Sequence, residues 1–159
     1  GYLLSITGVG AIVGTVISGS LQDSQRLGLA MLLSALAFSA FIYIFALISW
    51  IGVPSAFYFA LGTLFFASIF SSIFMVTTTT ILQLEVPDQL RGRVMGFHGI
   101  SYNLFPLGAL LVGAIAETNN PSAAISLSTT IFVAYLIWVF FTQIEVRKIN
   151  GSRLTKNPV

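Results

Sequence analysis

The sequence contains no cysteine, one histidine and very little charge. Without cysteine it can form neither disulfides nor thiolate metal sites, and one histidine cannot form a pair, so we expect no metal and no cofactor. Seven Lys and Arg residues are too few for a nucleic-acid-binding surface, so we expect no nucleic-acid partner. Charged residues make up 8% of the chain, against about 25% in a soluble domain. This shortage of charge excludes a soluble globular fold.

Long apolar stretches take the place of the missing charge. Hydrophobic residues make up 56% of the chain, its mean hydropathy is +0.94, and no Lys, Arg, Asp or Glu lies between Arg26 and Glu85. Apolar stretches of about 20 residues are typical of membrane-spanning helices. The sequence therefore predicts an all-α, polytopic membrane helical bundle over residues 1–143, with five spans at about 2–21, 27–50, 54–84, 94–116 and 123–143. Residues 144–159 are predicted to form a cytoplasmic tail.

Two of these spans cannot be straight helices of ordinary length. The third span has about 31 residues and would measure roughly 46 Å, more than the ~30 Å hydrocarbon core requires. It must therefore tilt, bend or project from the bilayer. The fourth span contains Pro106, which lacks the N–H that would donate within the helix, so a bend is predicted near Tyr102.

The basic residues all fall on one side of the predicted bundle. The ends of five spans alternate between the two membrane faces, and one face then receives every Lys and Arg: Arg26, Arg91, Arg93, Arg147, Lys148, Arg153 and Lys156. The positive-inside rule assigns that face to the cytoplasm. The N-terminus is then outside, the C-terminus is inside, and an odd number of spans predicts at least one preceding helix in the complete protein.

Small residues predict where helices approach closely. Gly10, Gly14 and Ser18 recur every four residues along the first span, and Gly108 and Gly113 lie in the fourth. Small side chains let the backbones of membrane helices come together. The second and fifth spans have no such ridge, and we expect them to face lipid.

Two predicted cytoplasmic connectors carry recognisable motifs. The first reads GSLQDSQRLG over residues 19–28, and the second reads VPDQLRGRVMG over residues 86–96 and leads to Pro106-Leu107-Gly108. Together they resemble the second half of a major facilitator superfamily transporter, in particular its drug and siderophore exporters. The first connector departs from the family pattern G-x-L-x-D-R-x-G-R-R, because Ser24 replaces a basic residue and Arg26 alone remains of the arginine cluster. On this resemblance the five spans match the eighth to twelfth helices of a twelve-helix fold.

The motifs and the polar residues of the spans provide the candidate site residues. The gating connectors contribute Gly19, Asp23, Arg26, Pro87, Arg91, Gly92 and Arg93. The candidates for the substrate path are Ser68, Ser71, Met75, Tyr102 and Asn103. By family analogy the first, third and fourth spans would line that path.

Each assignment has an ordinary structural alternative. Asp23 and Arg26 are expected to form a latch between helical bundles, and Arg91 and Arg93 have Glu85 and Asp88 as candidate partners, but arginines at these positions would also fix topology alone. The hydroxyls of the third span would equally bond to their own helix. Tyr102 and Asn103 would equally join neighbouring helices. The single histidine, His98, is either a proton relay or an interfacial histidine.

The resemblance implies a fragment of a secondary active transporter that exports small amphipathic organic molecules by alternating access. No charged residue lies at mid-membrane depth in any predicted span, so coupling to an ion gradient would require the missing N-terminal half. The predicted partners are the bilayer, a small-molecule substrate and the N-terminal helical bundle of the same polypeptide, in the bacterial inner (plasma) membrane. An intramembrane enzyme would need carboxylates, paired histidines or a serine with a base, which the spans do not offer. A membrane scaffold without transport, or an orphan truncated product, is the alternative.

The predicted topology can be tested directly because the chain has no native cysteine. Single cysteines placed beside Arg91 or Arg147 should react with a membrane-impermeant maleimide only from the cytoplasmic side. A cysteine at Asn120 should react only from the opposite side. Labelling of either basic neighbourhood from outside would contradict the five-span arrangement.

Overall fold

The computed structural model of the chain is built of helices throughout its described part, which comprises residues 1–21, 26–51, 56–118, 120–143 and 149. The helices are α1 (Tyr2–Leu21), α2 (Leu27–Ile51), α3 (Ala56–Glu85), α4 (Asp88–Asn103), α5 (Phe105–Thr118) and α6 (Pro121–Thr142). Five stretches are long and apolar enough to span a membrane, with α4 and α5 together forming the fourth. The predicted all-α bundle with five membrane-spanning helices is confirmed.

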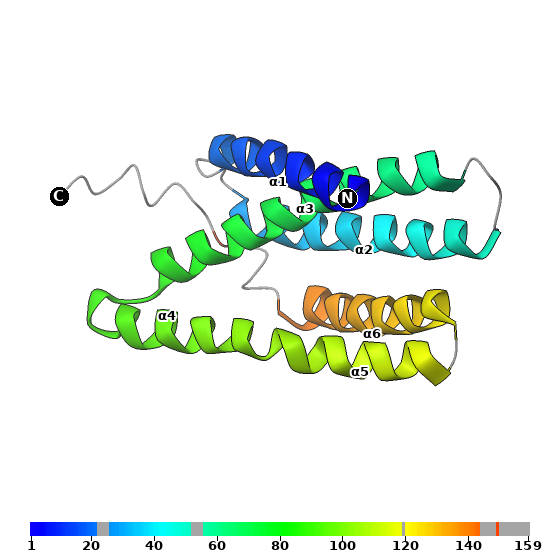
Figure 1. Cartoon of the computed structure of the whole chain (residues 1–159). Helices are drawn as coiled ribbons and strands as arrows, with labels where there is room; N and C mark the ends of the chain where they lie inside the picture. The colour runs from blue at the N-terminus through cyan, green and yellow to red at the C-terminus, as the bar shows by residue number, and fades with distance from the viewer. Residues whose placement is uncertain (22–25, 52–55, 119, 144–148, 150–159) are drawn as a thin grey trace.

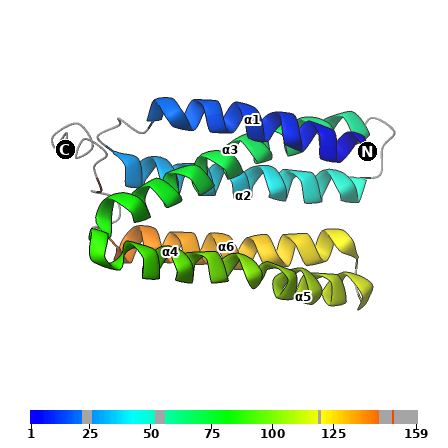
Figure 2. The ribbon, with the colours of Figure 1, turned by 60° about the vertical axis from the view of Figure 1, so that its left-hand side comes forward.

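The helices run roughly along one direction, and α3 is inclined to the others (Figures 1 and 2). Their contacts form a series in which α1 packs on α3, α3 on α2, α2 on α6 and α6 on α5. The end of α1, the α3–α4 junction and the end of α6 lie at one end of the bundle, and the α5–α6 junction lies at the other (Figure 1). Arg26, Arg91 and Arg93 therefore share one end.

The contact between α1 and α3 is made through the small-residue ridge. Gly10, Gly14 and Ser18 are the buried residues of α1. A Cβ atom added at Gly10 would collide with the Ser68 hydroxyl and lie 2.6 Å from the Phe65 carbonyl oxygen. One added at Gly14 would collide with the Ile69 carbonyl oxygen and lie 2.9 Å from the Ile69 Cα. The two backbones thus approach as closely as glycine allows.

The main apolar cluster of the described residues lies between α2 and α6. Its buried members are Leu32, Ala35 and Leu136, surrounded by Met31, Leu36, Phe74, Phe132, Val139 and Phe140. On the other side of α2, the Phe41 ring stacks on Phe66 and Phe70 of α3, with centroids 5.4 and 5.7 Å apart. The helix α2, expected at the periphery, therefore lies between α3 and α6, and exposes a stripe that includes Leu33, Ile44 and Leu47.

Two helices begin before the predicted starts of their membrane spans. Helix α4 begins at Asp88, ahead of the predicted span at Val94, because Pro87 precedes a first turn that carries the acidic Asp88, and an acidic residue stabilises a helix N-terminus. The RGR sequence of residues 91–93 therefore lies in helix α4 and not in a connector. The last span begins at Pro121, since proline is well suited to the first helical position.

The predicted bend in the fourth span is present at Leu104, which separates α4 from α5. The Leu104 N–H donates to the Ser101 carbonyl at 3.2 Å, a tighter turn than an α-helix, and the regular pattern resumes with Gly108 donating to Leu104. Pro106 cannot donate to Tyr102, the residue four positions earlier. The break therefore lies where the missing N–H leaves the helix weakest.

A methyl group at Gly14 should destabilise the bundle. Gly14→Ala places that group against the backbone of Ile69 and should cost about 1–3 kcal/mol of unfolding free energy, measured by SDS-induced unfolding in mixed micelles. Gly8 is the matched control, because it lies on the same helix with nothing within 4 Å of its added Cβ. Equal stability of Gly14→Ala and Gly8→Ala would contradict the close contact of α1 with α3.

Restoring the N–H at position 106 should repair the helix between α4 and α5. In Pro106→Ala, the amides of residues 104–107 should exchange with deuterium about two- to tenfold more slowly, the range for one hydrogen bond. Pro121→Ala is the control, because the first residue of a helix has no acceptor within the helix. Unchanged exchange in Pro106→Ala would show that the break has another cause.

Candidate functional site

Several hydroxyls of α3 bond to carbonyls of their own helix, and that of Ser68 also faces α1. Ser68 donates to the Phe65 carbonyl at 2.8 Å and faces Gly10 of α1. Three threonines nearer the end of α3 bond to carbonyls four residues earlier: Thr78 to Phe74, Thr79 to Met75 and Thr80 to Val76. For these residues the structure has the self-bonded arrangement that was the alternative interpretation.

Ser68, Ser71 and Met75 share one face of α3, because they are spaced by three and seven residues. Ser68 and Ser71 are half-buried, whereas the Met75 side chain is 50% exposed. Helix α1 covers the Ser68 part of this face through Gly10. Of the three candidates, Met75 is the one that offers an accessible surface.

Tyr102 and Asn103 lie in the last turn of α4, directly before the break at Leu104. Both side chains are exposed, and the Asn103 amide donates to the Gly99 carbonyl at 3.4 Å. The Tyr102 and His98 rings form a T-shaped pair, with centroids 5.2 Å apart and planes at 80°. The structure therefore groups three polar side chains, from His98, Tyr102 and Asn103, over little more than one helical turn.

His98 has an unusual environment for a membrane helix. Its Nε2 atom is shielded from the surface and has no hydrogen-bond partner among the described residues. A shielded polar atom without a partner is costly in an apolar medium. The sequence pointed to His98 as the one histidine, but nothing in its spacing indicated that one ring nitrogen would lack a partner.

The second gating connector forms the start of α4. Asp88 and Arg91 form an ion pair at 2.6 Å within the first turn, with both side chains largely exposed. Exposed pairs of this kind contribute about 0–1 kcal/mol. Pro87 immediately precedes the helix, and Gly92 and Arg93 lie on its exposed surface. The pairing of Arg91 is therefore local to α4.

The first gating connector is described only at its edges. Gly19 lies in the last turn of α1 with open space at its Cα, and the Arg26 carbonyl accepts a hydrogen bond from the Ala30 N–H at 3.0 Å as α2 begins. Asp23 lies outside the described residues. The Ile149 carbonyl accepts a hydrogen bond from the Gly28 N–H at 3.4 Å, which places Ile149 beside the start of α2.

Gly108 and Gly113 have no close neighbour, unlike Gly10 and Gly14. Nothing in the described chain lies within 4 Å of a Cβ added at either residue. Both instead line an apolar groove of about 620 Å³ between α5 and the start of α6, together with Phe105, Ala109, Val112, Ala116, Pro121 and Ile125. In the described chain, the small residues of α5 therefore line a groove and do not form a close helix contact.

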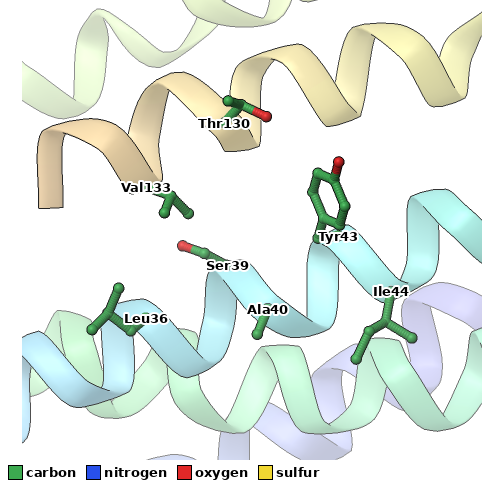
Figure 3. Close-up of a pocket in the computed structure, with 7 residues that line it drawn as sticks. All are labelled: Leu36, Ser39, Ala40, Tyr43, Ile44, Thr130 and Val133. Atoms are coloured by element: carbon green, nitrogen blue, oxygen red, sulfur yellow. The ribbon is translucent and has the colours of Figure 1, made fainter. Parts of the chain in front are cut away.

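A second cavity, of about 560 Å³, lies between α2 and α6 (Figure 3). It is lined by Leu36, Ser39, Ala40, Tyr43, Ile44, Thr130 and Val133. No motif in the sequence indicates this site, although a tyrosine well inside an apolar span, Tyr43, is an available signal. No group of three His, Asp or Glu side chains suited to a metal ion occurs in the described chain.

Comparison with known proteins identifies relatives over nearly the whole chain. The family model of the Major Facilitator Superfamily matches residues 1–157. Similar proteins include the enterobactin exporter EntS of Escherichia coli O81 (strain ED1a), 29% identical over 157 residues that cover 96% of this chain and 35% of the exporter. The enterobactin exporter EntS of Shigella flexneri is also 29% identical, over 96% of this chain and 36% of its own length. The chain thus spans about a third of the length of these relatives. No solved structure matches it.

Proposed function

The chain belongs to the Major Facilitator Superfamily, and from this premise we propose that it is part of a secondary active transporter that exports small amphipathic organic molecules. The single observation that carries the proposal is the match of the family model to residues 1–157. The relatives named as enterobactin exporters support the outward direction of transport. Alternating access between two helical bundles is the mechanism that this proposal implies.

The exposed surfaces of the bundle support the presence of a partner bundle. No residue of α4 or α5 is buried within the described chain, and Phe97, Phe105 and Leu110 are 75%, 78% and 68% exposed. Since the relatives are about three times as long, we propose that an N-terminal bundle of the same polypeptide packs against this side. Residues 1–143 would then form most of the C-terminal bundle, and 144–159 its tail.

The substrate path is proposed to follow the faces of α1, α3 and α4. Met75, Tyr102 and Asn103 are exposed side chains on these helices, and polar side chains within a membrane span usually face the interior of the bundle or a water-filled path. Ser68 and Ser71 would line the path behind them, where Ser68 already faces α1. Small movements of α1 across α3 would be eased by the glycines at their contact.

The two gating connectors are proposed to close the cytoplasmic side. Asp23 with Arg26 would form one latch, and the segment Pro87–Arg93, with Gly92, would form the other. The Asp88–Arg91 pair is exposed, so Arg91 could exchange Asp88 for a carboxylate of the opposite bundle at little cost. Gly19 would let the end of α1 approach that bundle.

Energy coupling is proposed to reside in the N-terminal bundle. The sequence has no Asp, Glu, Lys or Arg between Arg26 and Glu85 or between Arg93 and Glu117. Moving one charge through the membrane potential supplies about 2.3 kcal/mol per 100 mV, which requires a charged or titratable group at depth. An antiporter of the bacterial inner membrane would place that group upstream of these residues.

An efflux assay tests the proposal. Cells that express the complete protein should expel an amphipathic cationic dye, or enterobactin, faster than cells without it. Asp23→Asn should lower the efflux rate at equal membrane abundance, because it removes the charge of the latch. A membrane scaffold would give no difference between expressing and control cells, and full efflux by Asp23→Asn would remove the latch from the mechanism.

A further inference from the structure

The cavity between α2 and α6 lies at the middle of the membrane span. Ser39 is twelve residues from the start of α2, or about 18 Å along a helix of about 37 Å. Thr130 and Val133 are likewise central in α6. The cavity volume of about 560 Å³ falls within the range of about 300–1,000 Å³ that is typical of small-molecule sites.

Tyr43 is the unusual residue of this cavity. Tyrosine in a membrane helix normally lies at the interface, where its hydroxyl reaches water, but Tyr43 lies only about 6 Å along the helix axis from the midpoint of α2. Figure 3 shows its hydroxyl pointing across the cavity toward α6. The described residues provide no hydrogen-bond partner for it, and the ring is 42% exposed. An O–H group without an acceptor in hydrocarbon is costly.

The other two hydroxyls of the cavity have already used their donors. Ser39 donates to the Ala35 carbonyl at 2.8 Å, and Thr130 donates to the Ser126 carbonyl at 2.7 Å. The rest of the lining is apolar apart from the Tyr43 hydroxyl. The cavity therefore presents one free O–H donor within an apolar wall.

We propose that this cavity binds a lipophilic small molecule that carries a single hydrogen-bond acceptor, such as an aromatic ketone, and that enters from the bilayer. The apolar wall would hold the body of the molecule, and its acceptor oxygen would take the Tyr43 hydrogen bond. The site lies between α2 and α6, apart from the α1, α3 and α4 faces of the proposed path, so it does not depend on transport.

A phospholipid fits the cavity less well than such a molecule. The ester oxygens of phospholipids lie near the edge of the hydrocarbon core, about 15 Å from its middle. An acyl chain in the cavity would therefore fill its volume and leave the Tyr43 hydroxyl without an acceptor. A small molecule dissolved in the bilayer core can bring its acceptor to that depth.

Photolabelling of the complete protein in phospholipid vesicles tests the site. Benzophenone is a suitable probe, because its excited ketone abstracts hydrogen from a nearby C–H bond and the two radicals then join. Labelled residues, found by mass spectrometry, should concentrate at positions 36–44 and 130–133. Tyr43→Phe should weaken labelling there by about two- to tenfold, the range for one hydrogen bond. Ala40→Phe should abolish it by filling the cavity.

Matched controls separate this site from general partitioning into lipid. Tyr135→Phe removes a hydroxyl from α6 at a position 57% exposed and outside the cavity lining, so labelling should not change. Fluorenone should compete with benzophenone about two- to tenfold better than fluorene, which has the same shape without the oxygen, and Tyr43→Phe should erase that difference. Three results would overturn the proposal: labelling that is spread evenly over the exposed helix faces, labelling that is absent from the cavity, and labelling that Tyr43→Phe does not change. Evenly spread labelling would indicate that only lipid acyl chains occupy the cavity.

Discussion

The bilayer allows this chain almost no unpaired backbone, and the rest of the structure follows from that constraint. Hydrocarbon supplies no hydrogen bonds, so each N–H and C=O group within a span must be paired inside its own helix. The same rule extends to side chains: the hydroxyls of Ser68, Thr78 and Ser39 bond to carbonyls three or four residues earlier. Where the sequence removes a donor, at Pro106, the helix breaks at Leu104 beside the polar residues Tyr102 and Asn103.

Within lipid, close contact between helices depends on shape more than on apolar character, because lipid tails are as apolar as leucine. This explains why Gly10 and Gly14, and not larger residues, join α1 to α3. The contact of α2 with α6 uses a different solution, in which Leu32, Ala35 and Leu136 interlock. The first contact brings two backbones close together, whereas the second packs larger apolar side chains.

The polar groups without partners mark where the described chain needs something more. Tyr43 lines the cavity between α2 and α6, and the His98 Nε2 atom is shielded and has no hydrogen-bond partner among the described residues. Both side chains project from helices, α2 and α4. The unburied α4 and α5 helices add an apolar surface of the kind that a second bundle would cover.

Length, hydropathy and the position of charge in the sequence were sufficient for the five spans, the all-helical fold and the bend caused by Pro106, since each depends on residues close together in the chain. The start of α4 at Asp88 was missed, because the RGR sequence reads as a polar loop when no neighbouring structure is considered. The glycines of α1 and α5 carry similar local signals, yet only Gly10 and Gly14 of α1 meet another helix in the described chain. The cavity joins Tyr43 to Thr130, which are far apart in sequence, so only the packing of α2 against α6 could bring them together. The hydrogen bonds within each helix depend on residues close together in the sequence, so the sequence determines them. Which helix face packs against which depends on how whole helices fit together, so only the tertiary structure determines it.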